Sequence, residues 1–280
     1  MTVFVLIPVF NRLHHTQHVI EALRAQTLTD NLSIVVINDG STDGTAEYLQ
    51  LQNDVVALQG DGNLWWGGAI QKGLEYVHVH GKDDDHVLFL NNDTWFAPNY
   101  VETLIHVSRE AGGAAVGSVI HEEGRDPPLV SIGPKININR LAVWDLLNQL
   151  PPEGQRHPQK TYRVDALSGR GTLYPAVLFR RYGGMHTWLL PHYMADYEIA
   201  MRFGRAGVPL LVSTEAVVFS SPVYGNDVSK MNWWQRYFSI RSSRNIVHGL
   251  MFYLLVGSAM QRITAPFRML CFGIWRAFSR

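Results

Sequence analysis

The sequence predicts an α/β fold: a mostly parallel central sheet flanked by helices, with a helical extension at the C-terminal end. One observation is that short apolar runs alternate with amphipathic stretches over the first half of the chain, which is typical of parallel sheets. Another is that the apolar runs end in polar turns, several of which contain glycine. Parallel strands end at one edge of their sheet, so we expect these turns to gather where such folds bind ligands.

Each element of this half can be placed from its pattern. Unbroken apolar runs indicate strands that are covered on both faces, and a period of 3.6 indicates helices. Strands are expected at residues 3–7, 32–37, 55–58, 87–90 and 114–119. Helices are expected around residues 19–23, 46–51, 70–77 and 100–111, with Thr16 as a possible N-cap of the first.

The second half of the chain is less regular. Residues 120–162 are rich in proline and glycine, and predict an irregular insertion that either forms part of a binding pocket or is a surface excursion. A turn-rich segment at residues 165–175 follows. A helix is then expected from about residue 191 to Gly207, followed by short strands at residues 208–212 and 216–219. From Trp233 onward the pattern is helical.

Composition excludes several classes of protein. The chain has 280 residues, 46% of them hydrophobic, enough for one large domain with or without an appendage. Lys+Arg and Asp+Glu are both 24, so no net charge attracts nucleic acid, and none is expected as a partner. Cys271 is the single cysteine, which excludes an internal disulfide and a CxxC metal site. No basic segment with a cleavage site follows Met1, so we expect no signal peptide and a cytoplasmic location.

Missing motifs narrow the α/β class further. No GxGxxG follows the first strand, which argues against a dinucleotide-binding Rossmann fold. The chain also lacks the GxxxxGK[ST] loop of nucleoside triphosphatases and the GxSxG elbow of α/β-hydrolases.

Five short motifs, taken in their order, resemble those of the family 2 glycosyltransferases, which have the GT-A fold. They are IPVFNR at residues 7–12, NDGSTDGT at 38–45, GNLWWGGA at 62–69, NND at 91–93 and ADYE at 195–198. The Trp-Trp segment and residues 237–245 are similar to the rhamnosyltransferase-like subgroup. The resemblance implies a GT-A domain at residues 1–245, with a nucleotide-binding half (1–119) and an acceptor half (120–245).

The resemblance implies a UDP- or dTDP-sugar donor bound by the early turns. Asp39 would accept a hydrogen bond from the imide N–H of the base, a role that suits a carboxylate, although an Asp before a glycine is also a common turn residue. Pro8 and Phe10 would form an apolar wall for the base, and Asn11 either contacts the nucleotide or only begins a helix. Further nucleotide contacts are expected from Asn63, Trp66, Gly68, Asn91 and Asn92.

The NND motif stands where the family has its DxD-type metal motif, with an amide in place of the first acid. Asp93 would hold Mg2+ or Mn2+ against the diphosphate, and Asn92 would hydrogen-bond ribose or sugar. Many members place a metal-binding His after the last strand, where this chain has Phe219-Ser220-Ser221-Pro222. A strand that ends in Asn-Asn-Asp is also a common turn.

Asp196 matches the general base of the family, which accepts a proton from the attacking acceptor hydroxyl. The alternative is that Asp196 is an ordinary N-cap of the helix that follows. Contacts to the acceptor are expected from Arg170, His192, Tyr193 and Glu198. For Glu198 the alternative is a pair with Arg202 on the same helix face.

The C-terminal tail, residues 246–280, contains no acidic residue and interleaves arginines with aromatic residues. Its apolar run, residues 250–260, is too short to span a bilayer. An amphipathic helix of this kind suits an anionic membrane surface, which predicts a peripheral protein on the inner face of the cell membrane. Packing on the catalytic domain or in a homodimer is the alternative.

Taken together, the resemblance and these residues imply an inverting glycosyltransferase of cell-surface polysaccharide assembly. It would transfer a sugar to a hydroxyl of a saccharide or polyprenyl-linked acceptor, with metal assistance and Asp196 as base. A sugar-nucleotide pyrophosphorylase is the second enzyme class considered, but it needs a Gly-rich, Arg-containing loop where this chain has Pro8 to Asn11. A non-catalytic nucleotide-sugar-binding scaffold is the third.

Overall fold

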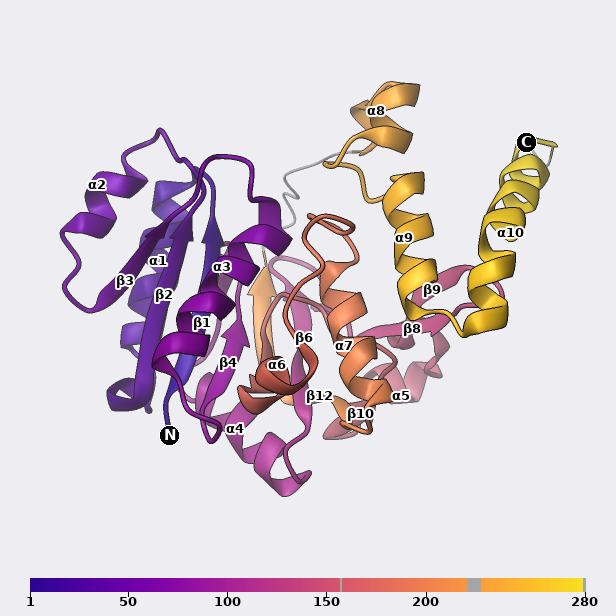
Figure 1. The fold of residues 1–280 in the computed structure, drawn as a ribbon. Helices are drawn as coiled ribbons and strands as arrows, with labels where there is room; N and C mark the ends of the chain where they lie inside the picture. The colour runs from indigo at the N-terminus through magenta and orange to yellow at the C-terminus, as the bar shows by residue number, and fades with distance from the viewer. Residues whose placement is uncertain (157, 221–227, 279–280) are drawn as a thin grey trace.

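A ten-stranded mixed sheet forms the centre of the molecule, with helices on both faces (Figure 1). The computed structural model describes residues 1–156, 158–220 and 228–278, with most of their side chains as far as residue 269. Its strand order is β10-β12-β6-β11-β4-β1-β2-β3, with β5 paired to β12 and β7 paired to β6. The strands are β1 (Val3–Val9), β2 (Leu32–Asn38), β3 (Val55–Gln59), β4 (His86–Phe89), β5 (Thr94–Trp95), β6 (Ala115–Glu122), β7 (Leu129–Ser131), β10 (Thr161–Arg163), β11 (Thr172–Pro175) and β12 (Leu210–Ser220). A separate hairpin consists of β8 (Pro134–Asn137) and β9 (Ala142–Asp145).

The helices divide into a set that covers the sheet and a set that follows it. The first comprises α1 (Leu13–Arg24), α2 (Thr45–Gln50), α3 (Trp65–His80), α4 (Tyr100–Glu110), α5 (Pro152–Arg156), α6 (Val177–Tyr182) and α7 (Ala195–Arg205). The second comprises α8 (Trp233–Phe238), α9 (Ile246–Val256) and α10 (Ala259–Phe278). Short 3-10 turns lie at Thr29–Asn31, Leu146–Gln149 and Val228–Lys230.

The strands expected in the first half are confirmed, and two cores explain why they are apolar throughout. Strand β1 is parallel to both β2 and β4, and β2 is parallel to β3. On one face Leu6 packs with Ile70 and Leu74 of α3, and on the other Val5 packs with Ile20 of α1 and with α4. The side chains of β1 therefore meet a core on either face, which leaves polar residues only at the ends of these strands.

The sheet also contains a strand that the sequence did not indicate. Within the expected turn segment at residues 165–175, Thr172–Pro175 forms β11, which pairs antiparallel with both β4 and β6. It is four residues long, ends in proline and follows Gly169 and Gly171, so its local pattern is that of a turn. Its position depends on pairing with two distant strands, which no local pattern reveals.

Other boundaries differ from the expectation for local reasons. The expected strands at residues 208–212 and 216–219 are one strand, β12, with an irregularity between Ser213 and Val217. The insertion at residues 120–162 contains β7 to β9 and α5, and β10 begins at its end. Helix α1 begins after Arg12, and the hydroxyl of Thr16 donates to the Arg12 carbonyl from inside the helix, so Thr16 is not its N-cap.

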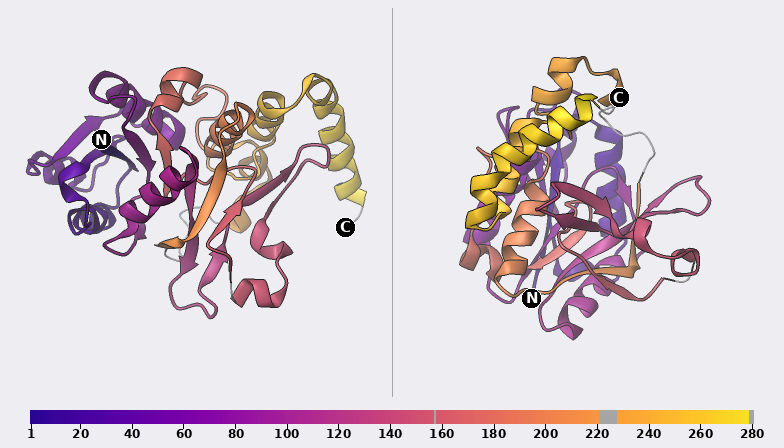
Figure 2. Two further views of the ribbon diagram at one scale, coloured as in Figure 1. Left: turned by 90° about the horizontal axis from the view of Figure 1, so that it is seen from below. Right: turned by 90° about the vertical axis from the view of Figure 1, so that its right-hand side faces the viewer.

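The segment after residue 245 is split between a buried and an exposed helix. Helix α9 packs on α7, and its Phe252 and Val256 are buried in the same core as Leu6. Helix α10 packs against α9 and leaves Met260, Ile263 and Phe267 exposed, at the opposite end of the molecule from β3 (Figure 2). For α9, the structure therefore agrees with the alternative that this part of the C-terminal tail packs on the domain. No helix in the described part of the chain is long and apolar enough to cross a membrane.

The packing of α9 predicts a contrast between two phenylalanines of the C-terminal segment. Phe252→Ala should lower the free energy of unfolding by about 3–5 kcal/mol, because the ring is 0% exposed and its removal leaves a cavity. Phe267→Ala, at a ring that is 69% exposed, should change it by less than about 0.5 kcal/mol. Urea unfolding of both variants measures this, and equal effects would contradict the packing described for α9.

Candidate functional site

The candidate site lies at the edge where β1, β2 and β4 end, the same end of the molecule at which α3, α7 and α9 begin (Figure 1). The turns after β1 and β2 are joined by hydrogen bonds that involve Asn11. Its N–H donates to Ser41 Oγ (2.8 Å), and its Oδ1 accepts from the N–H of Thr42 (2.9 Å). Asn11 thus joins these two turns, a structural role beside the nucleotide contact predicted for it. Phe10 is exposed beside the half-buried Pro8, so an apolar surface is available there.

Asp39 is buried and organises the loop that leads into α3. Its carboxylate accepts from the N–H groups of Gly62 (2.9 Å) and Trp65 (3.1 Å). A Cβ at residue 60 would collide with Asp39 Oδ1, so glycine is required for this close approach. A carboxylate has about four lone-pair directions, so two backbone contacts leave capacity for one to a base. Asp39 therefore has a structural task beside the predicted one.

Trp66, in the first turn of α3, contacts segments from both halves of the chain. Its Nε1 donates to Asn91 Oδ1 (3.1 Å) directly after β4. Its ring fills the space beside Gly169, where any Cβ would collide with the indole. Its neighbours differ in exposure: Asn63 is exposed, whereas Gly68 is buried and donates its N–H to the Leu64 carbonyl within the helix turn. The N–H of Gly68 is therefore already used when a nucleotide arrives.

Asp93 is the predicted metal ligand, and it forms an ion pair with Arg12. Arg12 Nη1 lies 2.9 Å from Asp93 Oδ2. The other oxygen, Oδ1, is buried and has no hydrogen-bond partner among the described residues. An orphaned carboxylate oxygen is a suitable ligand for a divalent cation, since Mg2+ commonly takes one or two carboxylates together with substrate phosphates and water. In the part of the chain that is described, no three acidic, His or Cys residues are arranged to hold a metal ion by themselves; Ser221 and Pro222 lie outside it.

Asn92 makes a contact within the fold that the sequence did not indicate. It is buried, and its Nδ2 donates to Thr16 Oγ1 of α1 at 3.2 Å. The amide thus fixes the turn after β4 to α1, and its predicted contact with ribose or sugar stays a prediction. Asn91, by contrast, contacts Trp66 at the site edge. Its Oδ1 accepts the hydrogen bond from Trp66 Nε1.

Asp196, the predicted base, lies in the first turn of α7 and is half-buried. Met194 is the N-cap residue, with φ 69°, so the N-cap alternative for Asp196 is wrong. Asp196 Oδ2 accepts from the N–H of Gly169 (2.8 Å), and Oδ1 accepts from the N–H of Tyr197 (3.0 Å). Burial raises the pKa of the carboxyl to about 6, although these backbone donors and the Arg170 charge oppose the shift. Such a carboxylate can exchange a proton near neutral pH.

Arg170 lies between the Asp93 turn and Asp196. Its Nη1 donates to Ser220 Oγ (3.0 Å), and Ser220 pairs with Thr94, the residue after Asp93. Its positive charge also reaches Asp196. A second set of contacts, independent of Trp66, thus brings Asp93 and Asp196 to one edge.

The remaining acceptor-side predictions have different outcomes. The rings of His192 and Tyr193 are 4.5 Å apart, and His192 is 5.9 Å from the Trp65 ring, beside the site. Glu198 is buried and accepts from both Nε (3.1 Å) and Nη2 (2.8 Å) of Arg202. The prediction that Glu198 contacts an acceptor is corrected: the pairing alternative holds, because the carboxylate anchors Arg202 inside the fold.

Backbone strain marks the same region. Among the described residues, the non-glycine residues with positive φ are Asn11, Arg12, Trp65, Leu141 and Met194. All of these except Leu141 are, or lie close in the chain to, a candidate site residue, as expected where a fold holds side chains against local preference. Arg12 belongs to the candidate site through its ion pair with Asp93, but no site role was predicted for it from the sequence. The one sequence feature that could have indicated it is its position directly after Asn11.

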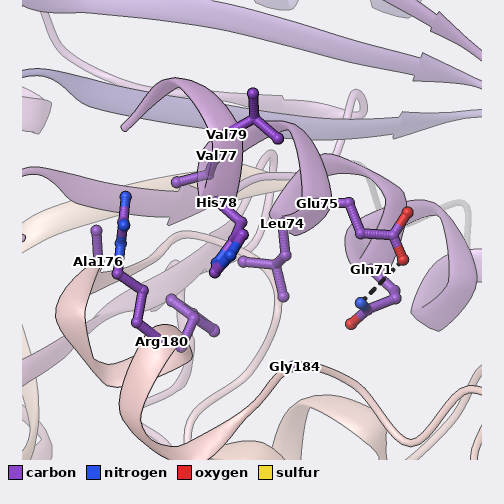
Figure 3. A pocket seen from close by; sticks show the side chains of 10 residues that line it. Gln71, Leu74, Glu75, Val77, His78, Val79, Ala176, Arg180 and Gly184 are labelled. Atoms are coloured by element: carbon purple, nitrogen blue, oxygen red, sulfur yellow. Dashed lines mark hydrogen bonds between the residues drawn. The ribbon is translucent and has the colours of Figure 1, made fainter. Parts of the chain in front are cut away.

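The cavity in Figure 3 lies elsewhere. It has a volume of about 380 Å³ and lies between the middle of α3 and α6, lined by residues such as Leu74, His78 and Arg180. Gln71 and Glu75 are hydrogen-bonded at its rim (Figure 3). None of the predicted site residues lines it.

Comparison with known proteins identifies the family. Residues 4–167 match the model of Glycosyl transferase family 2, and the chain belongs to this family. It is 28% identical over 110 residues to EpsH of Bacillus subtilis (strain 168), a protein named as a putative glycosyltransferase, covering 38% of this chain and 30% of that relative. It is 30% identical over 210 residues to an uncharacterized glycosyltransferase of Rickettsia prowazekii (strain Madrid E), covering 72% of this chain and 58% of the relative. The chain thus spans about a third to somewhat over half of these relatives.

Solved structures confirm the fold class. The structure of GalNAc-T7 with UDP, GalNAc and Mn2+ has a TM-score of 0.67 at 15% identity, covering 91% of this chain and 47% of that one. The GT-A fold expected from the sequence is therefore confirmed, with a sheet that is mixed. The rhamnosyltransferase-like subgroup stays a prediction.

The contact between Trp66 and Gly169 predicts the effect of one added methyl group. Gly169→Ala places a Cβ against the indole, so the backbone N–H that holds Asp196 must move. A displacement of about 1 Å near reacting groups can lower a rate about 100-fold, and we expect sugar transfer to fall at least about tenfold while the fold is retained. Gly154→Ala is the matched control, since its Cβ meets only ordinary contacts at 3.5 Å or more. Equal transfer rates in the two variants would contradict the coupling.

Proposed function

We propose that the protein is an inverting glycosyltransferase that moves a sugar from a UDP- or dTDP-sugar to a hydroxyl of a saccharide or lipid-linked acceptor. The observation that carries the proposal is Asp196, a half-buried carboxylate with a raised pKa, held at the edge where the turns of Asp39 and Asp93 also end. Family membership supports the class of reaction.

In the proposed step, the acceptor oxygen attacks the anomeric carbon as the bond from that carbon to the diphosphate oxygen breaks. Asp196 takes the proton of the acceptor hydroxyl, and the electron pair of the broken bond stays on the departing nucleotide diphosphate. Attack opposite to the leaving group inverts the configuration. The Gly169 N–H holds the carboxylate in place, and the positive charge of Arg170 favours its ionised form.

On the donor side, Asp93 would hold the Mg2+ or Mn2+, with Arg12 beside it. The ion supplies charge neutralisation to the leaving diphosphate. The orphaned Asp93 Oδ1 supports this assignment, as does the Mn2+ and UDP found with GalNAc-T7. Asp39 would bind the base and Phe10 would cover it, with Pro8 behind.

The cellular setting follows from the C-terminal segment and belongs to the same proposal. On α10 the exposed Met260, Ile263 and Phe267 lie on one helical face, with Arg262 and Arg268 nearby. Such a face suits an anionic membrane surface, where a polyprenyl-linked acceptor of polysaccharide assembly would be found. Peripheral attachment at the inner face of the membrane would account for the exposed apolar face of α10 and for the arginines near it. A non-catalytic scaffold, the second candidate, would not need a carboxyl held at a pKa near neutral.

The base assignment predicts a defined pH dependence. Asp196 must be ionised to accept a proton, and its pKa is raised to about 6. The transfer rate should therefore be constant above this pH and fall roughly tenfold per pH unit below it. Asp196→Asn should retain donor binding, measured by calorimetry, and lose transfer, measured as UDP or dTDP release with acceptor present. Asp84→Asn, at an exposed acid, is the control. Near-normal transfer by the Asp196→Asn variant would remove the base assignment.

The metal assignment predicts reversible inhibition by chelators. EDTA should abolish donor turnover, and added Mn2+ or Mg2+ should restore it, because the diphosphate leaves with its charge neutralised. Asp93→Asn should need a higher concentration of ion for half-maximal rate, since an amide is a weaker ligand than a carboxylate. Full activity in EDTA would exclude a metal role for Asp93.

A further inference from the structure

A group of cation-forming side chains surrounds the Trp65 ring on the acceptor side of the site. The guanidinium of Arg241 lies 5.6 Å from the centroid of this ring, and the His192 ring is 5.9 Å from it. His248 lies in the first turn of α9, close enough to His192 for the two charges to interact. Loops that follow α6 and α8 thus meet α9 around one indole.

In the part of the chain that is described, no ion pair balances this group. Among the described residues, no carboxylate lies within ion-pair distance of Arg241, His192 or His248. The Nδ1 atoms of both histidines are buried and have no hydrogen-bond partner there. Burial, followed by the positive charges of His248 and Arg241, lowers the pKa of His192 to about 4. Two buried ring nitrogens without a described partner leave hydrogen-bonding capacity unused beside a guanidinium, and a bound anion would use both.

The backbone that carries two members of this group, Arg241 and His248, is fixed by the side chain of Asn245. Asn245 Nδ2 donates to the carbonyls of Phe238 and Ser239 (both 3.0 Å), which closes the turn that carries Arg241. Its Oδ1 accepts from the N–H groups of Val247 (2.9 Å) and His248 (3.0 Å), which caps α9. One buried asparagine therefore fixes the backbone of the turn that carries Arg241 relative to the first turn of α9, which carries His248.

We propose that His192, Arg241 and His248 form a subsite for a phosphate group of the acceptor, an assignment that rests on the proposed function. Arg and His together suit phosphate, since the guanidinium offers paired donors and each imidazole, neutral or protonated, offers at least one N–H donor. The Trp65 and Tyr193 rings beside it supply faces on which a sugar can stack. The acceptor is then a phosphorylated saccharide or a saccharide linked through a phosphate.

The position of the subsite assigns it to the acceptor and not to the donor. His192 lies just ahead of the base Asp196, on the loop that enters α7. The donor diphosphate is assigned to Asp93 and Arg12, which follow the ends of β4 and β1. Trp65 lies between the two regions. Its backbone N–H donates to the Asp39 carboxylate, and its ring lies beside that of His192.

The test is a titration of His192 by ring-nitrogen NMR of the full chain, without any sugar transfer. The His192 signal is identified by its loss in His192→Gln. Saturating inorganic phosphate, at ionic strength matched with chloride, should raise the His192 pKa by at least about one pH unit, because an anion stabilises the imidazolium. Acetate at the same concentration should raise it much less. No rise with phosphate, or an equal rise with acetate, would overturn the proposal.

Variants separate the subsite from nonspecific binding. Arg241→Ala should raise the His192 pKa in the absence of phosphate, since a neighbouring positive charge is lost. It should also weaken phosphate binding at least about tenfold. Arg181→Ala is the matched control, because Arg181 likewise stacks on an aromatic ring, Tyr182 at 5.8 Å, but lies on α6. Equal effects of the two variants on phosphate binding would contradict the assignment.

Addition of UDP with Mn2+ distinguishes the two sources of phosphate. If the subsite serves the acceptor, saturating UDP leaves the response of His192 to inorganic phosphate in place. If UDP alone shifts His192 and phosphate then adds nothing, the group binds the donor, and the acceptor assignment fails. None of these readouts needs transfer, so an inactive protein with a phosphate-responsive His192 would refute the proposed function and leave the subsite standing.

Discussion

The packing of the Trp66 indole against Gly169 is the contact on which the geometry of the site depends. The ring takes the volume that any side chain at residue 169 would need, and its Nε1 holds Asn91 after β4. The same glycine donates its N–H to Asp196. A single aromatic side chain thus sets the distance between the turn that precedes Asp93 and the proposed base. Because the indole is rigid and contacts both segments directly, that distance does not rely on flexible loops.

The Arg12–Asp93 pair bears on the proposed cation site, where a carboxylate oxygen has no partner among the described residues. A partly buried carboxylate without a partner is costly, and Arg12 offsets this cost through one oxygen, Oδ2, while Oδ1 stays unpaired. Arg12 has φ 63°, and Asn11 before it has φ 58°, so the chain is bent locally to bring the guanidinium there. A cation on the free oxygen then joins an arrangement that already contains positive charge, which suits a dianionic diphosphate as the third component.

The sequence was most informative where a residue's role is set by its neighbours along the chain. Asp39, Asp93 and Asp196 each follow a recognisable local pattern, and the structure brings their turns to one edge. It was less informative where a distant partner decides: Asn92 donates to Thr16 of α1, 76 residues earlier in the chain, whereas the Glu198–Arg202 pair within α7 was one of the two alternatives that local spacing offered. Strand β11 was missed for the same reason, since both strands that it pairs with, β4 and β6, lie far from it in the chain. The His192–Arg241–His248 group draws on three separate segments of the chain, and no spacing in the sequence predicts it.

The place of β11 has a further consequence for motion. It comes from the part of the chain that was expected to receive the acceptor, yet it is hydrogen-bonded between β4 and β6, which belong to the nucleotide-binding part. Both parts therefore share one continuous sheet, and a rotation of one part against the other would have to break backbone hydrogen bonds in its middle. The sheet therefore forms a fixed floor under the candidate site, and the segments at its edge are the parts that can move without breaking it.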